Sequence, residues 1–184
     1  MQKGSRIDFT QDGSIKSGIL EEDTIYYSQF YGSIELKAGE KISFYQNGLF
    51  NSGVPSHPVT ISNKKYGDFS VLEDNLFSVH ETGEFKSGTL ENELYIINDL
   101  VGDFFIIDGK EAIFYKAGSL NKGTLSEDTT LDTIVGNLEF LEQTPITLSE
   151  DDDVSEGFVA RKYQIEGKDY YVGDLIEIEL DAFE

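Results

Sequence analysis

The fold of this chain is decided by one stretch and its copies: residues 42–55 are Ile42-Ser43-Phe44-Tyr45-Gln46-Asn47-Gly48-Leu49-Phe50-Asn51-Ser52-Gly53-Val54-Pro55. The pattern recurs as Ile7-Asp8-Phe9…Gly13…Ser17-Gly18, Phe77-Ser78-Val79…Gly83…Ser87-Gly88 and Ala112-Ile113-Phe114…Gly118…Lys122-Gly123. Its two glycines return every 35 residues, four times and without a gap. A period of this length is typical of repeat proteins, whose units stack because none can bury its apolar face alone.

Each copy has the chemistry of a β-hairpin. Ile42-Ser43-Phe44 alternates apolar and polar residues, as a half-buried strand does, and a turn ending at Gly48 follows. Asn-Gly and Asp-Gly favour a two-residue type I′ turn, in which both central residues have positive φ. No segment shows a convincing helical period. We therefore predict an all-β fold, an antiparallel hairpin array that forms an open meander or a rolled sheet.

Two further sets of glycines lie inside extended segments. Gly18, Gly53, Gly88 and Gly123 interrupt the returning strand, which predicts that each hairpin packs closely on its neighbour there. A third extended segment follows in each copy, at residues 25–36, 59–72, 94–107 and 131–141. Each has a glycine near its middle, at Gly32, Gly67, Gly102 and Gly136, the last one residue out of register. We therefore expect about three strands per repeat.

The copies define the expected domain organisation. The chain of residues 1–184 is predicted to be one domain, with repeats at 7–41, 42–76, 77–111 and 112–146. Residues 147–184 keep only a worn version of the hairpin, around Leu148 to Gly157. Terminal repeats are often atypical because they cover the end of the array. The sequence therefore predicts a capping tail.

Phe44-Tyr45-Gln46-Asn47-Gly48…Ser52-Gly53 and Phe114-Tyr115-Lys116-Ala117-Gly118…Lys122-Gly123-Thr124-Leu125 resemble bacterial MORN-like variant repeats. The resemblance covers the hairpin part of four units, less than half of the chain. MORN units are shorter, and the aromatic pair is absent at Phe9-Thr10 and replaced by Val79-His80. The resemblance implies an antiparallel β array used as a scaffold or binding surface, and it transfers no catalytic residue.

The composition restricts the partners. With 35 acidic and 14 basic side chains the formal net charge is -21, so we expect neither nucleic-acid nor anionic-membrane binding, both of which depend on Lys and Arg. The absence of cysteine excludes disulfides and thiolate sites and suits an oxidising setting. A bacterial cell envelope or secretion is therefore favoured over the cytoplasm. The start of the chain shows no signal peptide, so either the protein is cytoplasmic or a leader has been removed. The sequence does not determine the oligomeric state.

Catalytic motifs are weak. His57 and His80 are the two histidines, and a histidine site would need both brought together with a third group. His80 is most simply explained as an aromatic residue on the face of the repeat, because it occupies the position of Tyr45 and Tyr115. Paired carboxylates for a carbohydrate-active enzyme do not stand out among so many acids. We therefore expect a protein without enzymatic activity.

Two candidate binding sites remain. Asp151, Asp153, Ser155 and Glu156 have oxygen ligands suited to calcium, although the spacing of an EF-hand loop fails at Glu156 and Lys162. Tyrosines form the second candidate, a surface for a protein or a carbohydrate partner: Tyr26, Tyr27, Tyr31, Tyr163, Tyr170 and Tyr171. The same rings suit cross-strand packing, and the acidic stretch suits a solvated turn. The predicted function is a non-enzymatic binding or scaffold module, with a calcium-stabilised surface module and a carbohydrate-active enzyme as alternatives.

Overall fold

The computed structural model describes residues 7–179. This part of the chain is all-β, and no helix in it is long and apolar enough to cross a membrane. The chain divides into two compact units, residues 1–91 and 92–184, which we call unit 1 and unit 2 and describe separately.

Each unit contains hairpins of two kinds. In unit 1 the strands are β1 (Asp8–Phe9), β2 (Ile15–Ile19), β3 (Thr24–Ser28), β4 (Gly32–Leu36), β5 (Lys41–Phe44), β6 (Phe50–Gly53), β7 (Val59–Asn63), β8 (Gly67–Val71), β9 (Phe77–Val79) and β10 (Phe85–Thr89). In unit 2 they are β11 (Leu94–Ile96), β12 (Phe104–Ile106), β13 (Glu111–Phe114), β14 (Leu120–Thr124), β15 (Thr129–Thr133), β16 (Gly136–Phe140), β17 (Pro145–Leu148), β18 (Val154–Phe158), β19 (Tyr163–Ile165), β20 (Lys168–Tyr170) and β21 (Leu175–Glu177).

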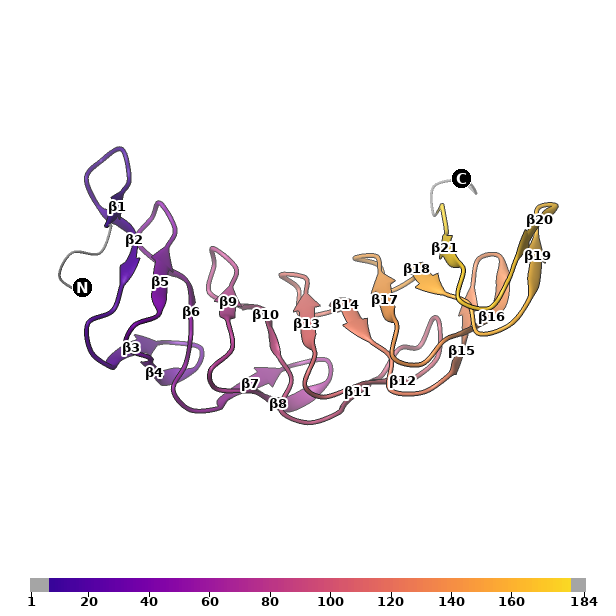
Figure 1. Ribbon diagram of the computed structural model, residues 1–184, viewed down its shortest axis with the longest axis horizontal. Helices are drawn as coiled ribbons and strands as arrows, with labels where there is room; N and C mark the ends of the chain where they lie inside the picture. The colour runs from indigo at the N-terminus through magenta and orange to yellow at the C-terminus, as the bar shows by residue number, and fades with distance from the viewer. Residues whose placement is uncertain (1–6, 180–184) are drawn as a thin grey trace. The chain divides into compact units, whose positions relative to one another are not determined.

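The first hairpin of each copy joins an antiparallel sheet. The order is β1-β2-β5-β6-β9-β10 in unit 1 and β13-β14-β17-β18-β21 in unit 2. The second hairpins, β3–β4, β7–β8, β11–β12, β15–β16 and β19–β20, are separate two-stranded sheets. In unit 1, β3–β4 and β7–β8 lie at one end of the first hairpins, below them in Figure 1. The all-β hairpin array is thus confirmed, and in each unit the sheet is an open meander.

The third extended segment of each repeat is a hairpin, so each full copy has four strands and the expected three were wrong. The glycine near its middle lies at the turn: Gly32, Gly67, Gly102 and Gly136 all have positive φ. A strand interior does not require that conformation, whereas a tight turn does. The third segment therefore reverses direction at the point where the sequence suggested a kink.

The turns of the first hairpins also differ from the expected type I′. In the turn at Gly48, the Tyr45 N–H donates to the Leu49 carbonyl at 2.8 Å, and the Gly48 N–H donates to the Tyr45 carbonyl at 3.0 Å. Gly48 has φ 81°, whereas Asn47 is not among the described residues with positive φ. A three-residue loop with one left-handed glycine fits this pattern. A type I′ arrangement occurs instead between β19 and β20, where Glu166 and Gly167 have φ 52° and 81°.

A row of serines crosses the sheet of unit 1. Ser43 pairs with Ser17 and Ser52, and Ser78 pairs with Ser52 and Ser87. The Oγ atoms of Ser43 and Ser52 lie 2.7 Å apart, and those of Ser78 and Ser87 lie 2.9 Å apart. Alternate residues of a strand point to opposite faces. The apolar neighbours of these serines, including Ile42 and Phe77, are therefore on the other face, where they are buried.

The interior glycines of the returning strands lie under apolar side chains from the preceding second hairpin. A Cβ added at Gly53 would lie 3.1 Å from Leu36 Cδ2, and one at Gly123 would lie 2.8 Å from Ile106 Cδ1. Gly88 and Gly157 face Val71 and Phe140 in the same way. The close approach predicted for Gly53, Gly88 and Gly123 is confirmed, and its partner is the last residue of a second hairpin.

Main-chain bonds reinforce this packing. The bridges Leu36↔Pro55 and Val71↔Leu90 occur in unit 1, and Ile106↔Leu125 and Phe140↔Val159 occur in unit 2. Beside the first of them, the Lys37 N–H donates to the Val54 carbonyl at 2.8 Å, and the Ser56 N–H donates to the Glu35 carbonyl at 2.8 Å. Each of these second hairpins is thus fixed to the segment just after the returning strand of the next first hairpin.

A fifth double hairpin begins at Pro145, within the expected fourth repeat, and continues into the expected capping tail of residues 147–184. β17–β18 occupies the place of a first hairpin and β19–β20 that of a second one. In the turn after β17, Asp152 has φ 72° and occupies the position held by glycine in the earlier copies. The loss of this glycine made the copy look worn in the sequence.

Candidate functional site

A cavity of about 260 Å³ in unit 1 is the candidate binding site. Three parts of the unit surround it: the tip of β3–β4, the beginning of β6, and the turn between β9 and β10. The lining residues are Tyr26, Tyr27, Ser28, Gln29, Phe30, Tyr31, Leu49, Phe50, Val79, Thr82 and Gly83. The structure therefore brings together three of the six tyrosines that the sequence proposed as a binding surface.

Two of these rings are fixed by contacts with the aromatic core. The Tyr26 ring stacks on Phe50 with centroids 4.8 Å apart, and the Tyr31 ring meets Phe77 edge to face at 5.4 Å. Phe50 and Phe77 are buried. Because aromatic pairs in these geometries are attractive beyond the area that they bury, the inner wall of the cavity is held in place by the fold.

The Tyr31 hydroxyl connects the tip of β3–β4 to the turn between β9 and β10. It donates to the Gly83 carbonyl at 3.0 Å. Burial, and to a lesser degree the Glu84 carboxylate, raises the pKa of Tyr31 well above its usual value. The phenol is therefore neutral at physiological pH and remains a hydrogen-bond donor.

Two other lining side chains are strongly exposed. Tyr27 keeps 77% of its surface in water and Phe30 keeps 44%. The Phe30 ring lies against Gly83, where a Cβ would collide with it. Large exposed apolar groups that gather at a cavity mark interaction sites more often than isolated ones do. Tyr27 and Phe30 thus form the accessible part of the aromatic wall.

The tip of β3–β4 is shaped by Ser28. Its Oγ accepts the N–H groups of Phe30 and Tyr31 at 3.1 and 3.3 Å. Asn63 and Asn98 accept the corresponding N–H groups in later copies, so polar capping here is a property of the fold. The aromatic residues are not such a property: the positions of Tyr26, Tyr27, Phe30 and Tyr31 are Ile96, Ile97, Leu100 and Val101 in the third copy.

The remaining tyrosines occupy the last second hairpin, where the chain's own cations lie over their rings. Tyr163 pairs with Tyr170 across β19 and β20. The Arg161 Cζ is 5.3 Å from the centroid of Tyr163, and Lys168 Nζ is 4.5 Å from that of Tyr170. Lys162 Nζ is 5.0 Å from the centroid of Tyr171, which is exposed. These rings therefore interact with basic side chains of unit 2.

The residues proposed for calcium lie around one hairpin, and two of them, Ser155 and Glu156, contact different partners. Asp151 lies in the turn that is closed by the Ser149 N–H donating to the Asp153 carbonyl at 2.8 Å. Ser155 Oγ donates to the Thr147 carbonyl at 3.2 Å, and the Glu156 carboxylate is 4.0 Å from Lys122 Nζ. Within residues 7–179 no group of three or more His, Asp or Glu side chains is placed to hold a metal ion.

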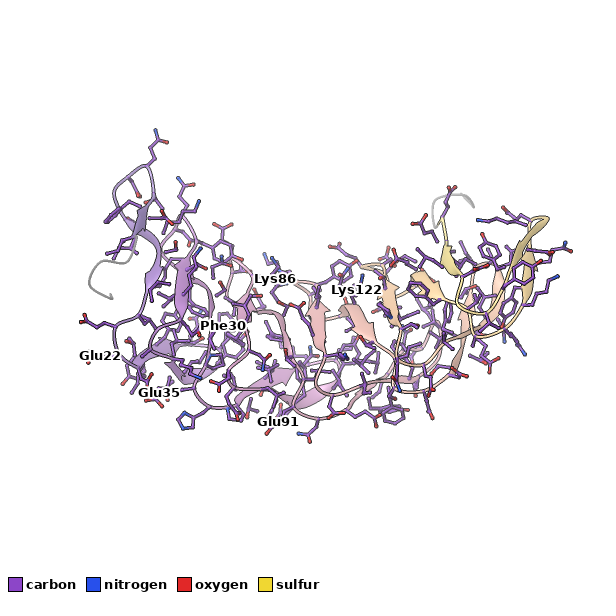
Figure 2. All side chains as sticks on the ribbon, viewed as in Figure 1. Glu22, Phe30, Glu35, Lys86, Glu91 and Lys122 are labelled. Carbon is purple, nitrogen blue, oxygen red and sulfur yellow. The ribbon has the colours of Figure 1, made fainter. Side chains whose placement is uncertain are left out.

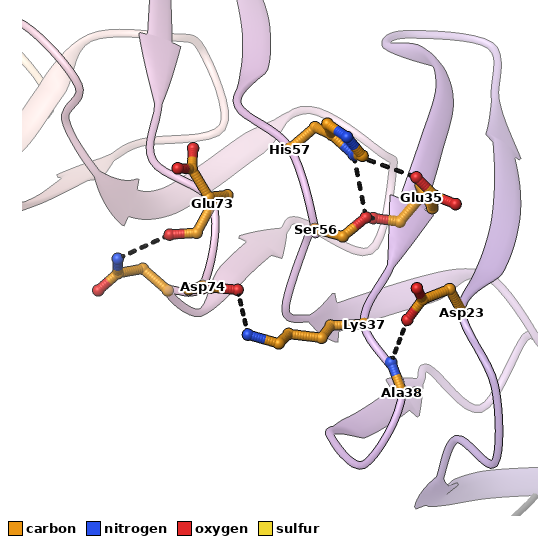
Figure 3. Close-up of polar contacts among 9 residues, drawn as sticks. Asp23, Glu35, Lys37, Ala38, Ser56, His57, Glu73 and Asp74 are labelled. Carbon is orange, nitrogen blue, oxygen red and sulfur yellow. Dashed lines mark hydrogen bonds and ion pairs between the residues drawn. The ribbon is translucent and has the colours of Figure 1, made fainter.

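The polar cluster at His57 resembles a catalytic arrangement only in its residue types (Figure 3). His57 Nδ1 lies 3.1 Å from Ser56 Oγ and also 3.1 Å from Glu35 Oε2. A Ser-His-acid relay needs the serine and the acid on different ring nitrogens. The shared nitrogen, together with the 74% exposure of the His57 side chain, shows that this cluster is an exposed polar contact without the geometry of a relay.

The sequence identified Tyr26, Tyr27 and Tyr31 but missed Phe30, Leu49, Thr82 and Gly83. One signal was present in it: Leu49 is apolar where the other copies have Ser14, Glu84 and Ser119. That substitution leaves Leu49 exposed on the cavity wall. The residues from β9–β10 could not be assigned, because nothing in the sequence shows how far the tip of β3–β4 reaches.

Comparisons with protein-family models, with curated proteins and with solved structures find no match for this chain. The functional assignment therefore depends on the chain's own geometry.

Proposed function

We propose that this protein is a non-enzymatic binding module whose double hairpins support the aromatic cavity of unit 1. The single observation that carries the proposal is a cavity lined by the rings of Tyr26, Tyr27, Phe30 and Tyr31, two of which remain strongly exposed. Its volume of about 260 Å³ is just below the roughly 300–1,000 Å³ of pockets for drug-sized ligands. The expected occupant is a single projecting side chain or a small head group of a partner.

Comparison of the copies supports a role in binding. The third copy builds the same hairpin with Ile96, Ile97, Leu100 and Val101, so the fold can be formed there without aromatic rings. Aromatic side chains provide large contact areas with few rotatable bonds, which favours recognition. The resemblance to MORN-like repeats also implies a scaffold or binding surface. A setting on the bacterial cell envelope stays a prediction from the sequence.

The proposal is tested by ligand-observed NMR with three probes of different chemistry: choline, its uncharged isostere neohexanol, and methyl glucoside. At least one probe should receive saturation transfer from the wild-type protein and lose it in Tyr27→Ala. The matched control is Ile97→Ala, because Ile97 holds the equivalent position of the third copy and is 45% exposed. Ile97→Ala should leave the signal unchanged.

Two results would overturn the proposal. One is the absence of transfer to all three probes at millimolar concentration. The other is transfer that persists in Tyr27→Ala, since binding would then occur elsewhere on the protein. A circular dichroism spectrum of each variant confirms that the hairpins are intact, which the exposure of Tyr27 leads us to expect.

A further inference from the structure

We propose that the group recognised by the aromatic cavity of unit 1 is a trimethylammonium cation. The inference rests on the proposed binding function and specifies the chemistry of the ligand. It is carried by five aromatic side chains that line one small cavity, four of them from residues 26–31, by the absence of charge in its lining, and by carboxylates on both sides of the turn that closes it.

The rings provide the attraction. The face of a Tyr or Phe ring carries negative electrostatic potential, so a cation within about 6 Å of the centroid is attracted to it, and more strongly when water is excluded. Six consecutive residues, Tyr26 to Tyr31, contribute four such rings to the cavity. A trimethylammonium group is soft and weakly hydrated compared with a lysine ammonium, and therefore suits an enclosure in which aromatic rings supply most of the contact.

The electrostatic surroundings also favour a cation. None of the described residues that line the cavity carries a charge, so no lysine or arginine in this lining competes for the rings. Glu81 and Glu84 flank Thr82 and Gly83, and the Thr82 hydroxyl donates to the Glu84 carboxylate. The influence of Glu84 on the Tyr31 phenol shows that this carboxylate acts electrostatically on the cavity wall.

Acidic side chains outnumber basic ones around the second hairpins of unit 1, where Lys37, Lys64 and Lys65 are the basic residues. Figure 2 shows Glu22, Glu35 and Glu91 on the side where the second hairpins lie, whereas Lys86 extends from the first-hairpin sheet. Clefts surrounded by one sign of charge raise the local concentration of the opposite ion. An anionic ligand would be repelled here, and a neutral ligand would gain nothing from the carboxylates.

The chain itself pairs tyrosine with cations elsewhere. In unit 2, Arg161, Lys162 and Lys168 each lie within 5.3 Å of a tyrosine ring centroid. The tyrosines of the cavity in unit 1 have no such partner in its described lining. The cation that these rings favour therefore has to come from a ligand.

The test is a pair of calorimetric titrations of the full chain, with choline and with neohexanol, in which carbon replaces the nitrogen. We expect choline to bind at least about fivefold more tightly than neohexanol, in keeping with cation–π energies of about 1–2 kcal/mol. Glu84→Gln keeps an acceptor for Thr82 while removing the charge, and should weaken choline alone. Glu73→Gln, in a loop outside the cavity lining, is the matched control.

The possible sources of the group are separated by a second pair of probes, phosphorylcholine and acetylated trimethyllysine amide. Tighter binding of phosphorylcholine indicates a head group of a surface polymer or lipid, and tighter binding of the lysine derivative indicates a methylated protein. Equal affinity for choline and neohexanol would overturn the ammonium assignment while leaving the binding function intact. Failure of both to bind, with methyl glucoside still bound, would also overturn it, and failure of all three would remove the binding function itself.

Discussion

At the scale of single residues, the spacing between double hairpins is set by glycines that admit a neighbouring side chain. A Cβ added to Gly53, Gly88, Gly123 or Gly157 would meet its nearest atom at 3.1, 3.0, 2.8 and 2.5 Å, respectively. Cores are packed as densely as crystals, so one added methyl group must displace its neighbours. Each glycine therefore determines how closely the preceding second hairpin approaches the strand.

Alanine at these glycines should destabilise the protein in the order of the distances. Gly53→Ala is expected to have the smallest effect and Gly157→Ala the largest, within about 1–3 kcal/mol, the range for overpacked cores. Urea unfolding of the four variants measures the series. Ile106→Ala should partly rescue Gly123→Ala, because Ile106 is the side chain that the new methyl group meets. Fully additive effects of Ile106→Ala and Gly123→Ala would show that this contact is not the cause.

A second prediction at this scale concerns Tyr31 at alkaline pH. Its pKa is raised in the folded protein, first by burial and then by Glu84, above the value of about 10 in the unfolded chain. The unfolded state therefore loses its proton first, and stability should be complete below pH 10 and fall as the pH rises above it. Tyr31→Phe should reduce this fall.

At neutral pH, Tyr31→Phe should lower the unfolding free energy by about 1 kcal/mol, because the hydrogen bond to the Gly83 carbonyl is lost. Tyr27→Phe serves as the control, since Tyr27 is strongly exposed. An alkaline stability profile that is identical in the wild type and in Tyr31→Phe would contradict the assignment to this phenol.

At the scale of elements, the turn after each second hairpin needs one residue with left-handed backbone. Gly39 and Gly109 supply it in the first and third copies, and Asp74 supplies it in the second with φ 60°. In the fourth copy Gln143 adopts φ 56°, while its N–H donates to the Leu125 carbonyl at 2.9 Å. A residue with a Cβ is strained in this region, and glutamine has no local hydrogen bond to compensate as asparagine does.

Gln143→Gly should therefore stabilise the protein by about 0.5–1 kcal/mol. Gln143→Ala is the matched control, because it removes the same side chain and keeps the Cβ, and it should give no gain. Thermal unfolding of the two variants beside the wild type measures the difference. An equal effect of Gly and Ala would show that the side chain, and not the backbone conformation, limits stability at this position.

The elements also show what the sequence could predict. The hairpin at residues 42–53 was recognised because the alternation of apolar and polar residues and the Asn47-Gly48 turn signal both indicate a hairpin. The hairpin at β3–β4 was not, because Gly32 alone marks its turn, and the preceding Phe30 and Tyr31 N–H groups depend on Ser28 as their acceptor. The cavity could be predicted only in part, because the stacking of copies brings Tyr26 and Thr82 to the same cavity, and local sequence patterns do not encode that stacking. The calcium prediction rested on the acidity and spacing of Asp151, Asp153, Ser155 and Glu156. In the structure this stretch contains a hairpin turn, in which Asp152 takes the position that glycine holds in earlier copies.

At the scale of the whole molecule, the charge of -21 opposes the compact state. Several acidic side chains nevertheless have structural partners: Asp23 Oδ1 accepts the Ala38 N–H at 2.7 Å, and Asp128 Oδ1 accepts the Glu142 N–H at 2.8 Å. The ion pair of Lys37 with Asp74 at 2.5 Å joins two turns (Figure 3). Some of the acidic side chains therefore stabilise the fold through hydrogen bonds and ion pairs, and the other acidic side chains repel one another.

Sodium chloride should raise the melting temperature by a few degrees, since the screening length falls from about 30 Å at 0.01 M to about 8 Å at 0.15 M. Calcium at matched ionic strength should add nothing beyond screening, because Ser155 and Glu156 have different partners and no described group of three carboxylate or imidazole side chains is placed to hold a metal ion. Differential scanning calorimetry measures both. An additional calcium shift that disappears in the Asp151→Asn, Asp153→Asn variant would instead establish a specific site.

The bridges between each second hairpin and the segment after the next returning strand have a further consequence for which insertions and deletions the chain can tolerate. Leu36 pairs with Pro55 and Phe140 pairs with Val159, a separation of 19 residues in both copies, although the fourth second hairpin is one residue shorter at its Ile134-Val135 tip. Length varies at the tip while the bridged segment stays constant. Insertions, epitope tags or altered loops should therefore be tolerated at tips such as Ile134-Val135, whereas a single-residue deletion between Phe140 and Val159 would shift every later partner out of step.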